Sequence, residues 1–231
     1  MSISQAMLLA AGRGIRLRPL TDTIPKPLLE VGGDSLISRH LCRIQAAGII
    51  DITINVSHLG DKICQSLGDG SDFGVRLRYS VEEEPLETAG GIKLALARGL
   101  LAADDPFLCV NTDIICDYDF AHLPRLPADK CCHLILVDNP PAHPRGDFSL
   151  EKSNLLLPPA VNTYTYSGIG VYHPVLFSGL EIGKPEAMLP LLKVAIAKRL
   201  ADGEIYGGLW HDTGTPESLA AARRAVSQSG C

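Results

Sequence analysis

The chain has 231 residues, of which 46% are hydrophobic, 5% aromatic and 20% charged, and its net charge at pH 7 is −5. This is the composition of a globular protein. Its negative balance, with acids and bases interspersed, argues against nucleic acid or an anionic membrane as the main partner. A small anionic ligand stays possible, because a local basic loop can lie on an acidic protein.

The N-terminal residues Met-Ser-Ile-Ser-Gln lack the basic and apolar segments of a signal peptide. No apolar run approaches the roughly 18 residues that span a bilayer. We therefore expect a cytoplasmic protein with no membrane contact. Its cysteines form neither a C-x-x-C pair nor a metal-ligand spacing, which favours buried free thiols. They are Cys42, Cys64, Cys109, Cys116, Cys131, Cys132 and Cys231.

In the first half of the chain, predicted strands alternate with predicted helices. The apolar and alternating patterns predict strands at 3–11, 51–56, 75–80 and 106–111. Helices are predicted at 36–48, capped by Asp34 or Ser35, at 59–67 after a Ser57 cap, and at 91–101. This alternation is typical of right-handed βαβ units and predicts a mainly parallel sheet.

The second half has a different pattern. Strands are predicted at 133–137 and 161–171, with a proline-rich turn at 139–144 between them. An amphipathic helix is predicted at 188–200 and an alanine-rich helix at 216–226, followed by a frayed tail at 227–231. No linker is long enough to separate independent units, so we expect one domain over 1–231.

The most informative stretch is at 8–21, where the first predicted strand runs into a Gly-x-Gly turn with three arginines. It is followed by Lys26 between two prolines, which stiffen the backbone on both sides. Glycine turns let backbone N–H groups approach oxygen atoms closely, and basic side chains add positive charge. The pattern is neither a P-loop nor the usual dinucleotide fingerprint, but it favours a polyphosphate site.

Together, four motifs resemble the sugar-1-phosphate nucleotidyltransferase family. They are the Leu-Ala-Ala-Gly-x-Gly-x-Arg-Leu-x-Pro-Leu-Thr string, Pro25-Lys26-Pro27, Asn111-Thr112-Asp113 and Trp210-x-Asp212-x-Gly214-Thr215. The stretches at 84–91, 137–140 and 145–148 are most similar to its uridylyltransferases that act on N-acetylmuramate α-1-phosphate in cell-wall recycling. Ile15 and Thr112 depart from the family pattern, which commonly has Ser or Thr at the first position and Gly at the second.

The resemblance implies an α/β fold, a Rossmann-like three-layer sandwich with a mainly parallel central sheet and a smaller sugar-binding β part. Residues 1–115 would be mainly the nucleotide-binding half, and 116–226 mainly the sugar-binding half. The implied reaction is attack by a sugar 1-phosphate on the α-phosphorus of UTP. It needs no general base, since a phosphate monoester has its second pKa near 6.

The resemblance also assigns the residues that handle charge. Asp113 and Asp212 would bind Mg²⁺, since carboxylates suit a hard cation that also holds phosphate oxygens. Arg16, Lys26 and Asp113 would be catalytic. Arg16 would contact the β- and γ-phosphates beside the N–H groups of Gly14 and Ile15, and Lys26 would bridge the α-phosphate and the sugar phosphate.

The remaining implied contacts divide between the base and the sugar. The nucleotide would lie on Leu9, Ala10, Ala11, Gly12, Gly14, Ile15, Arg16, Lys26, Glu82 and Gly90. The sugar would lie on Asn111, Gly146, Asp147, Ser167 and Gly168. The Glu82 carboxylate can accept one hydrogen bond from uracil N3–H, or two from guanine N1–H and N2–H₂. The number of donors therefore favours guanine, whereas the motifs favour uracil.

Two alternatives remain open from the sequence. The first is a mannose-1-phosphate guanylyltransferase, with GTP in place of UTP. The second is a nucleotide-sensing subunit that keeps the fold without catalysis, although Lys26, Asp113 and Asp212 are all present. Neither reading requires an obligate protein partner.

Overall fold

The computed structural model describes residues 3–157 and 162–229. In this part of the chain, one large sheet has the strand order β5-β4-β1-β6-β11-β8-β12-β10-β9. Its strands are β1 (Gln5–Leu9), β4 (Asp51–Val56), β5 (Arg76–Val81), β6 (Phe107–Asn111), β8 (Cys132–Val137), β9 (Ser149–Glu151), β10 (Asn154–Leu156), β11 (Thr165–Tyr172) and β12 (Ala201–Ile205). The sheet is parallel from β5 to β6, whereas β11 is antiparallel to both of its neighbours.

Short strand pairs and helices complete the architecture. The pairs are β2 (Glu30–Val31) with β3 (Asp34–Ser35), and β7 (Ile114–Cys116) with β13 (Trp210–Asp212). The helices are α1 (Leu36–Ala46), α2 (Gly60–Leu67), α3 (Glu87–Ala97), α4 (Met188–Ala197) and α5 (Pro216–Ser229). None of the helices in the described residues is both long and apolar enough to cross a membrane.

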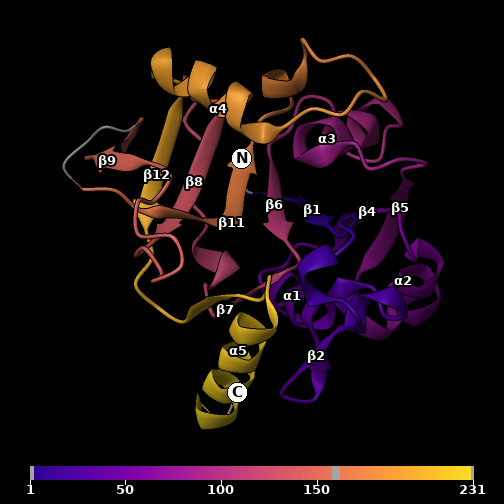
Figure 1. Ribbon diagram of the computed structural model, residues 1–231. Helices are drawn as coiled ribbons and strands as arrows, with labels where there is room; N and C mark the ends of the chain where they lie inside the picture. The colour runs from indigo at the N-terminus through magenta and orange to yellow at the C-terminus, as the bar shows by residue number, and fades with distance from the viewer. Residues whose placement is uncertain (1–2, 158–161, 230–231) are drawn as a thin grey trace.

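Alternate residues of the central strands pack on opposite faces of the sheet, which makes three layers. In β6, Leu108 and Val110 belong to a core cluster with residues of α1 and α2. Phe107 and Cys109 belong to a second cluster with residues of α3 and α4. Figure 1 shows α1 and α2 on one side of the sheet and α3 and α4 on the other. This two-residue alternation is the period of a strand covered on both faces, and the predicted α/β sandwich is confirmed.

Several predicted boundaries differ from the structure. Ser35 caps α1 by accepting a hydrogen bond from the Ser38 N–H, whereas Ser57 caps nothing, because α2 begins only at Gly60. Helix α3 begins at Glu87, four residues before the predicted start. The predicted tail is wrong for 227–229, which continue α5; residues 230–231 and the predicted strand start at 161 lie outside the described residues.

The cysteine prediction holds in part. In the described residues the cysteines are free, and Cys109, Cys116, Cys131 and Cys132 are buried. Cys42 is exposed and Cys64 is half-buried. Cys42 was wrongly expected inside, because it lies on the solvent side of α1, between the buried Leu41 and Ile44. Cys231 lies outside the described residues.

The strand register places polar side chains around the end of β1. Leu9, the last residue of β1, pairs with Asn55 of β4 on one side and with Asn111 of β6 on the other. In an open parallel sheet, ligands bind beyond the carboxyl ends of the strands. We therefore expect a ligand site at the loops that follow β1, β4, β5 and β6.

Candidate active site

A cavity of about 220 Å³ lies at this carboxyl edge of the sheet. Its walls come from the end of β1 and the loop after it, the Lys26 turn, the end of β4, the segment from the end of β5 into α3, and the end of β6. The lining residues are Leu9, Ala10, Ala11, Gly12, Lys26, Pro27, Asn55, Glu82, Pro85, Glu87, Thr88, Asn111, Thr112 and Asp113. Five separate segments of the chain thus meet around one space.

The loop after β1 is held in place by polar contacts on both sides. The Ala10 N–H donates to Asn55 Oδ1 at 2.8 Å, and Thr112 Oγ1 donates to the Leu9 carbonyl at 2.7 Å. Gly14 adopts a left-handed conformation with φ +61°. Its carbonyl accepts a hydrogen bond from Thr21 Oγ1, and a Cβ at Gly14 would lie 2.9 Å from Thr21 Cγ2. Glycine is therefore required here both for its φ angle and for space.

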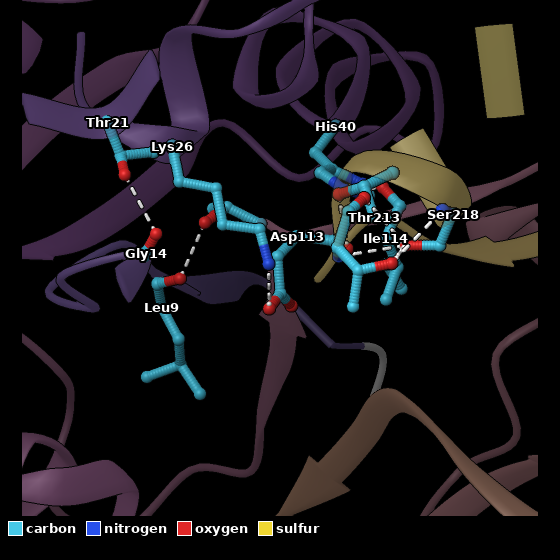
Figure 2. Close-up of polar contacts among 11 residues, drawn as sticks. Leu9, Gly14, Thr21, Lys26, His40, Asp113, Ile114, Thr213 and Ser218 are labelled. Carbon is cyan, nitrogen blue, oxygen red and sulfur yellow. Dashed lines mark hydrogen bonds and ion pairs between the residues drawn. The ribbon is translucent and has the colours of Figure 1, made fainter. Parts of the chain in front are cut away.

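Lys26 points into the cavity and forms an ion pair with Asp113. The Lys26 Nζ lies 2.7 Å from Asp113 Oδ2, and the lysine residue is only 8% exposed. Figure 2 shows the lysine side chain reaching from its turn to the aspartate at the end of β6. The carboxylate side chain is 37% exposed, so it stays open to the cavity. A buried ammonium group is held here with one carboxylate beside it.

The β7–β13 pair brings the second predicted carboxylate to the same corner. Asp212 is opposite Ile114 in the register of this pair. The Thr213 N–H and Oγ1 both donate to the Asp113 carbonyl, at 2.9 and 2.7 Å. His40 Nε2 lies 3.0 Å from the Ile114 carbonyl, on the side of α1. Asp113 and Asp212 are therefore fixed as neighbours by backbone and side-chain hydrogen bonds.

Arg16 reaches this corner across a glycine. A Cβ at Gly214 would lie 2.8 Å from Arg16 Nη2 and 2.9 Å from Asp212 Oδ2. The absence of a side chain at Gly214 therefore leaves room for the guanidinium group next to the Asp212 carboxylate. Lys26 and Asp113 thus line the cavity. Arg16 and Asp212 lie near each other around Gly214, outside the lining of that cavity.

At the other end, Glu82 is enclosed by protein donors. It is 3% exposed, and burial raises the pKa of its carboxyl group. Its Oε1 accepts from Asn55 Nδ2 at 2.7 Å, and its Oε2 accepts from the Leu86 N–H at 2.9 Å. These two hydrogen bonds stabilise the carboxylate form and act against the effect of burial.

A second cavity, of about 260 Å³, adjoins the first and shares Leu9, Thr88 and Asn111 with it. Its other lining residues are Cys109, Asp147, Phe148, Tyr166, Tyr172, Met188, Leu189 and Leu192. Asp147 accepts a hydrogen bond from the Tyr166 N–H at 2.8 Å and lies 3.0 Å from His143 Nε2. The space combines an apolar wall from α4 with a few fixed polar groups, as small-molecule sites commonly do.

The comparisons with known proteins agree with this geometry. The family model described as nucleotidyl transferase matches residues 5–145, and thus covers both the loop after β1 and the end of β6. This chain belongs to the nucleotidyl transferase family. The predicted family is thereby confirmed.

Relatives of this nucleotidyl transferase differ in the substrates that their names give. It is 46% identical to an N-acetylmuramate α-1-phosphate uridylyltransferase from Neisseria meningitidis, over 95% of this chain and 96% of that protein. It is 33% identical to a mannose-1-phosphate guanyltransferase from Aspergillus oryzae, over 93% of this chain but only 62% of that protein. The first match extends over the full length of both chains.

Solved structures share the fold at low sequence identity. A putative glucose-1-phosphate thymidylyltransferase from Bacillus anthracis has a TM-score of 0.82 and 21% identity, over 96% of this chain and 94% of that one. HddC from Yersinia pseudotuberculosis, complexed with GMP-PN, has a TM-score of 0.76 and 19% identity, over 96% of this chain and 99% of that one. These two likenesses support the fold of the nucleotidyl transferase.

The structure brings most of the predicted residues of the nucleotidyl transferase together. The first cavity is lined by Leu9, Ala10, Ala11, Gly12, Lys26, Glu82, Asn111 and Asp113, and the second by Asn111 and Asp147. Gly168 lies against Asn111, since a Cβ there would be 3.0 Å from the asparagine Cβ. Ile15 is 61% exposed on the turn after Gly14.

Other predicted residues have packing roles that the sequence did not indicate. A Cβ at Gly90 would lie 2.3 Å from the Lys184 carbonyl, so this glycine faces the loop before α4. A Cβ at Gly146 would lie 2.5 Å from Asn139 Oδ1, so its space is taken by the protein. Ser167 is fully buried, and its carbonyl accepts a hydrogen bond from Trp210 Nε1. Close approach of the chain to itself accounts for these small residues.

Several residues of the first cavity were not predicted from the sequence. Asn55 is the most important, because it joins the loop after β1 to Glu82. Its signal is an amide near the end of a strand in which apolar residues alternate with polar ones. Thr88 lines both cavities, and Glu87 adopts a positive φ of +57°, which is uncommon outside glycine. Both residues belong to the 84–91 stretch that carries the family resemblance, but no site role was predicted for either of them.

Proposed function

We propose that this chain transfers a uridylyl group from UTP to N-acetylmuramic acid α-1-phosphate, and releases pyrophosphate. The observation that carries the proposal is the ion pair of the buried Lys26 with Asp113 in a cavity that adjoins a second one, with Asp212 on the strand paired to β7 and Arg16 close to it. The substrate pair is supported by the full-length similarity to a protein named for it.

The proposed reaction is an in-line displacement at phosphorus. An oxygen of the sugar phosphate forms a bond to the α-phosphorus, the bond from that phosphorus to the bridging oxygen of the β-phosphate breaks, and pyrophosphate leaves with the electron pair. The attacking phosphate is largely dianionic at neutral pH and needs no general base. The protein must therefore bring anions together and stabilise the charge that develops.

The buried ammonium group of Lys26 supports this role. It lies in the turn at 26–28 and lines the first cavity, where it would contact the α-phosphate and the incoming sugar phosphate. Arg16 would neutralise the β- and γ-phosphates, beside the N–H groups of Gly14 and Ile15. Because Lys26 is nearly excluded from water, its charge acts in a medium of low dielectric constant.

We also propose that Asp113 and Asp212 hold Mg²⁺. The donor types fit, because Asp212 ends β13 and Asp113 directly precedes its partner strand β7. Two carboxylates are hard oxygen ligands of the kind that this ion takes while it keeps positions for phosphate oxygens. The ion would supply further positive charge at the triphosphate. When the nucleotide is bound, Lys26 would exchange its contact with Asp113 for phosphate oxygens.

The experiment is a substrate panel with pyrophosphate release as the readout. UTP and GTP are each combined with N-acetylmuramic acid α-1-phosphate, N-acetylglucosamine 1-phosphate and mannose 1-phosphate, with Mg²⁺ present. We expect the highest kcat/KM for UTP with the muramyl substrate. Preferred use of GTP with mannose 1-phosphate would favour the guanylyltransferase alternative. Mg²⁺-dependent binding of UTP with no turnover of any pair would favour the sensing subunit.

A further inference from the structure

The carboxylate of Glu82 is held on both sides by donors of the protein itself. Asn55 Nδ2 donates to its Oε1 at 2.7 Å, and the Leu86 N–H donates to its Oε2 at 2.9 Å. Asn55 is held in turn, because its Oδ1 accepts from the Ala10 N–H at 2.8 Å. Asn55 and Glu82 are each only 3% exposed. We refer to this chain of hydrogen bonds, from Ala10 through Asn55 and Glu82 to Leu86, as the Asn55 bridge.

A glycine in helix α3, Gly91, leaves the space that the Asn55 bridge occupies. A Cβ at Gly91 would lie 2.5 Å from Glu82 Oε1 and 2.9 Å from Asn55 Nδ2. Glycine weakens a helix interior, so its presence in the second turn of α3 is explained by this close approach. The bridge is therefore enclosed by α3 on one side and borders the first cavity on the other.

The two candidate bases make different demands on such a carboxylate. Guanine presents two donors side by side, N1–H and N2–H₂, and a carboxylate reads them with both oxygens turned toward the base. Uracil presents a single donor, N3–H, between two carbonyl oxygens. In this structure each oxygen of Glu82 already accepts one hydrogen bond from the protein, so the carboxylate is not free to turn both oxygens toward a guanine.

We propose that Asn55 determines base specificity by holding Glu82 in this orientation, so that the site accepts uracil and rejects guanine. This inference rests on the proposed function, because it concerns the base of the same nucleotide. A buried polar group that is left unpaired discriminates strongly between ligands. Guanine needs both oxygens turned toward it at once, whereas uracil needs an acceptor for a single donor.

The test compares UTP with GTP in an Asn55→Ala variant. We expect the ratio of kcat/KM for UTP to that for GTP to fall by about tenfold or more, the size of one hydrogen bond to a charged group. The freed Oε1 would then be able to turn toward guanine. Looser packing alone would lower both kcat/KM values together and leave their ratio unchanged.

Thr53→Val is the matched control. Thr53 lies two residues earlier on β4, is buried, and donates from Oγ1 to the Leu100 carbonyl at 2.7 Å. Its removal deletes a buried hydrogen bond of the same strand without touching the cavity. We expect a lower melting temperature and an unchanged UTP to GTP ratio.

Gly91→Ala tests the same bridge from the opposite side and keeps both of its side chains. The added Cβ would force Glu82 Oε1 away from Asn55 Nδ2, while alanine itself favours the helix. We expect the same direction of change in the ratio. This variant decides the question if Asn55→Ala does not fold.

The outcomes separate the inference from the proposed function. If the wild type uses UTP and the folded bridge variants keep its UTP to GTP ratio, or raise it, the inference is overturned and the function stands. A wild type that uses GTP as well as UTP also overturns the inference. If no substrate pair turns over, the proposed function fails, and equilibrium binding of UTP and GTP to the same variants then tests the inference by the same ratio.

Discussion

Lys26 and Asp113 are separated by 87 positions in the chain, yet their side chains meet at 2.7 Å. Pro25 and Pro27 restrict the backbone on both sides of the lysine, which limits the directions that its side chain can take. A buried ammonium group is costly unless an anion compensates it. Asp113 is that anion in the free protein, and we infer that phosphate oxygens take its place when the nucleotide binds.

Lys26→Ala is therefore expected to reduce kcat/KM by about 100-fold or more, as happens when a donor that stabilises developing charge is removed. The measurement is steady-state release of pyrophosphate. Lys62→Ala is the control, because Lys62 is an exposed lysine that donates to the Thr23 carbonyl. A Lys26 variant with activity close to that of the control would remove the lysine from the reaction.

At this scale the sequence indicated residue types but not their partners. The Pro-Lys-Pro motif and the two aspartates were found from their order, and the structure brings them together. Glu82 was predicted to contact the base, which stays a prediction; the sequence did not indicate that both of its oxygens also accept hydrogen bonds from the protein. Its main partner, Asn55, lies 27 positions away, and nothing in the local pattern indicates that contact.

Among the elements, α3 and the segment before α4 are joined by backbone hydrogen bonds. The N–H groups of Ala89 and Gly90 donate to the Glu186 carbonyl, and the Glu186 N–H donates to the Leu86 carbonyl. Helix α4 follows at Met188 and contributes to the second cavity. The wall of the nucleotide cavity is thus attached to the wall of the sugar cavity, and Gly90 leaves the space for this contact.

Gly90→Ala should separate these two elements, because the new Cβ would lie 2.3 Å from the Lys184 carbonyl. Overpacking of this kind costs about 1–3 kcal/mol, and each kcal/mol lowers the melting temperature by roughly 2–4 °C in a chain of this size. We also expect KM to rise more for the sugar phosphate than for UTP.

Gly179→Ala serves as the control, since a Cβ there has no neighbour within 4 Å in the described residues. Thermal unfolding and steady-state kinetics give the two readouts. Equal melting temperatures for Gly90→Ala and the control would show that the contact between α3 and the 184–186 segment contributes little.

Long strands were predicted from the sequence, whereas very short strands were not. The long apolar strands β1, β4 and β6 were predicted, because their pattern is local. The three-residue strands β7 and β13 were not, because only their pairing across the fold defines them. Helix α3 begins earlier than its apolar pattern suggests, since Glu87 takes a left-handed conformation that single-sequence rules do not anticipate.

For the whole molecule, α1 is linked to the site through a buried histidine. Burial lowers the pKa of His40 from 6.5 to about 4. The nearby Arg43 and Arg39 act in the same direction, while the hydrogen bond with the Ile114 carbonyl and the charge of Asp113 oppose it. The folded protein therefore keeps His40 neutral at a pH at which the unfolded chain binds a proton.

Stability should consequently fall as the pH is lowered from 6.5 towards 4, because the unfolded state binds more protons in that window. At pH 5 the contribution of His40 amounts to a loss of about 2 kcal/mol relative to pH 7. His40→Gln removes the titrating group and keeps a donor for the Ile114 carbonyl. Urea unfolding of both proteins at pH 7 and pH 5 measures the difference. Equal losses in the two proteins would contradict the assignment.

The overall architecture was largely predictable, since alternating strand and helix patterns specify a sandwich with a parallel first half. The pairing of β11 between β6 and β8 was not, because antiparallel strands here are joined across long stretches of chain. That the nucleotide and sugar sites adjoin each other was expected only because of the family resemblance, and the order of the motifs alone did not predict it. Their shared wall at Leu9, Thr88 and Asn111 comes from the structure.

Everything proposed for the reaction depends on one ion being shared by two carboxylates next to Lys26. Crystals of the protein with UTP and Mn²⁺ in place of Mg²⁺ would locate the ion by its anomalous scattering. The account predicts an ion bound by oxygens of both Asp113 and Asp212 and by the triphosphate. An ion held by the bound nucleotide but out of contact with these two aspartates would contradict it.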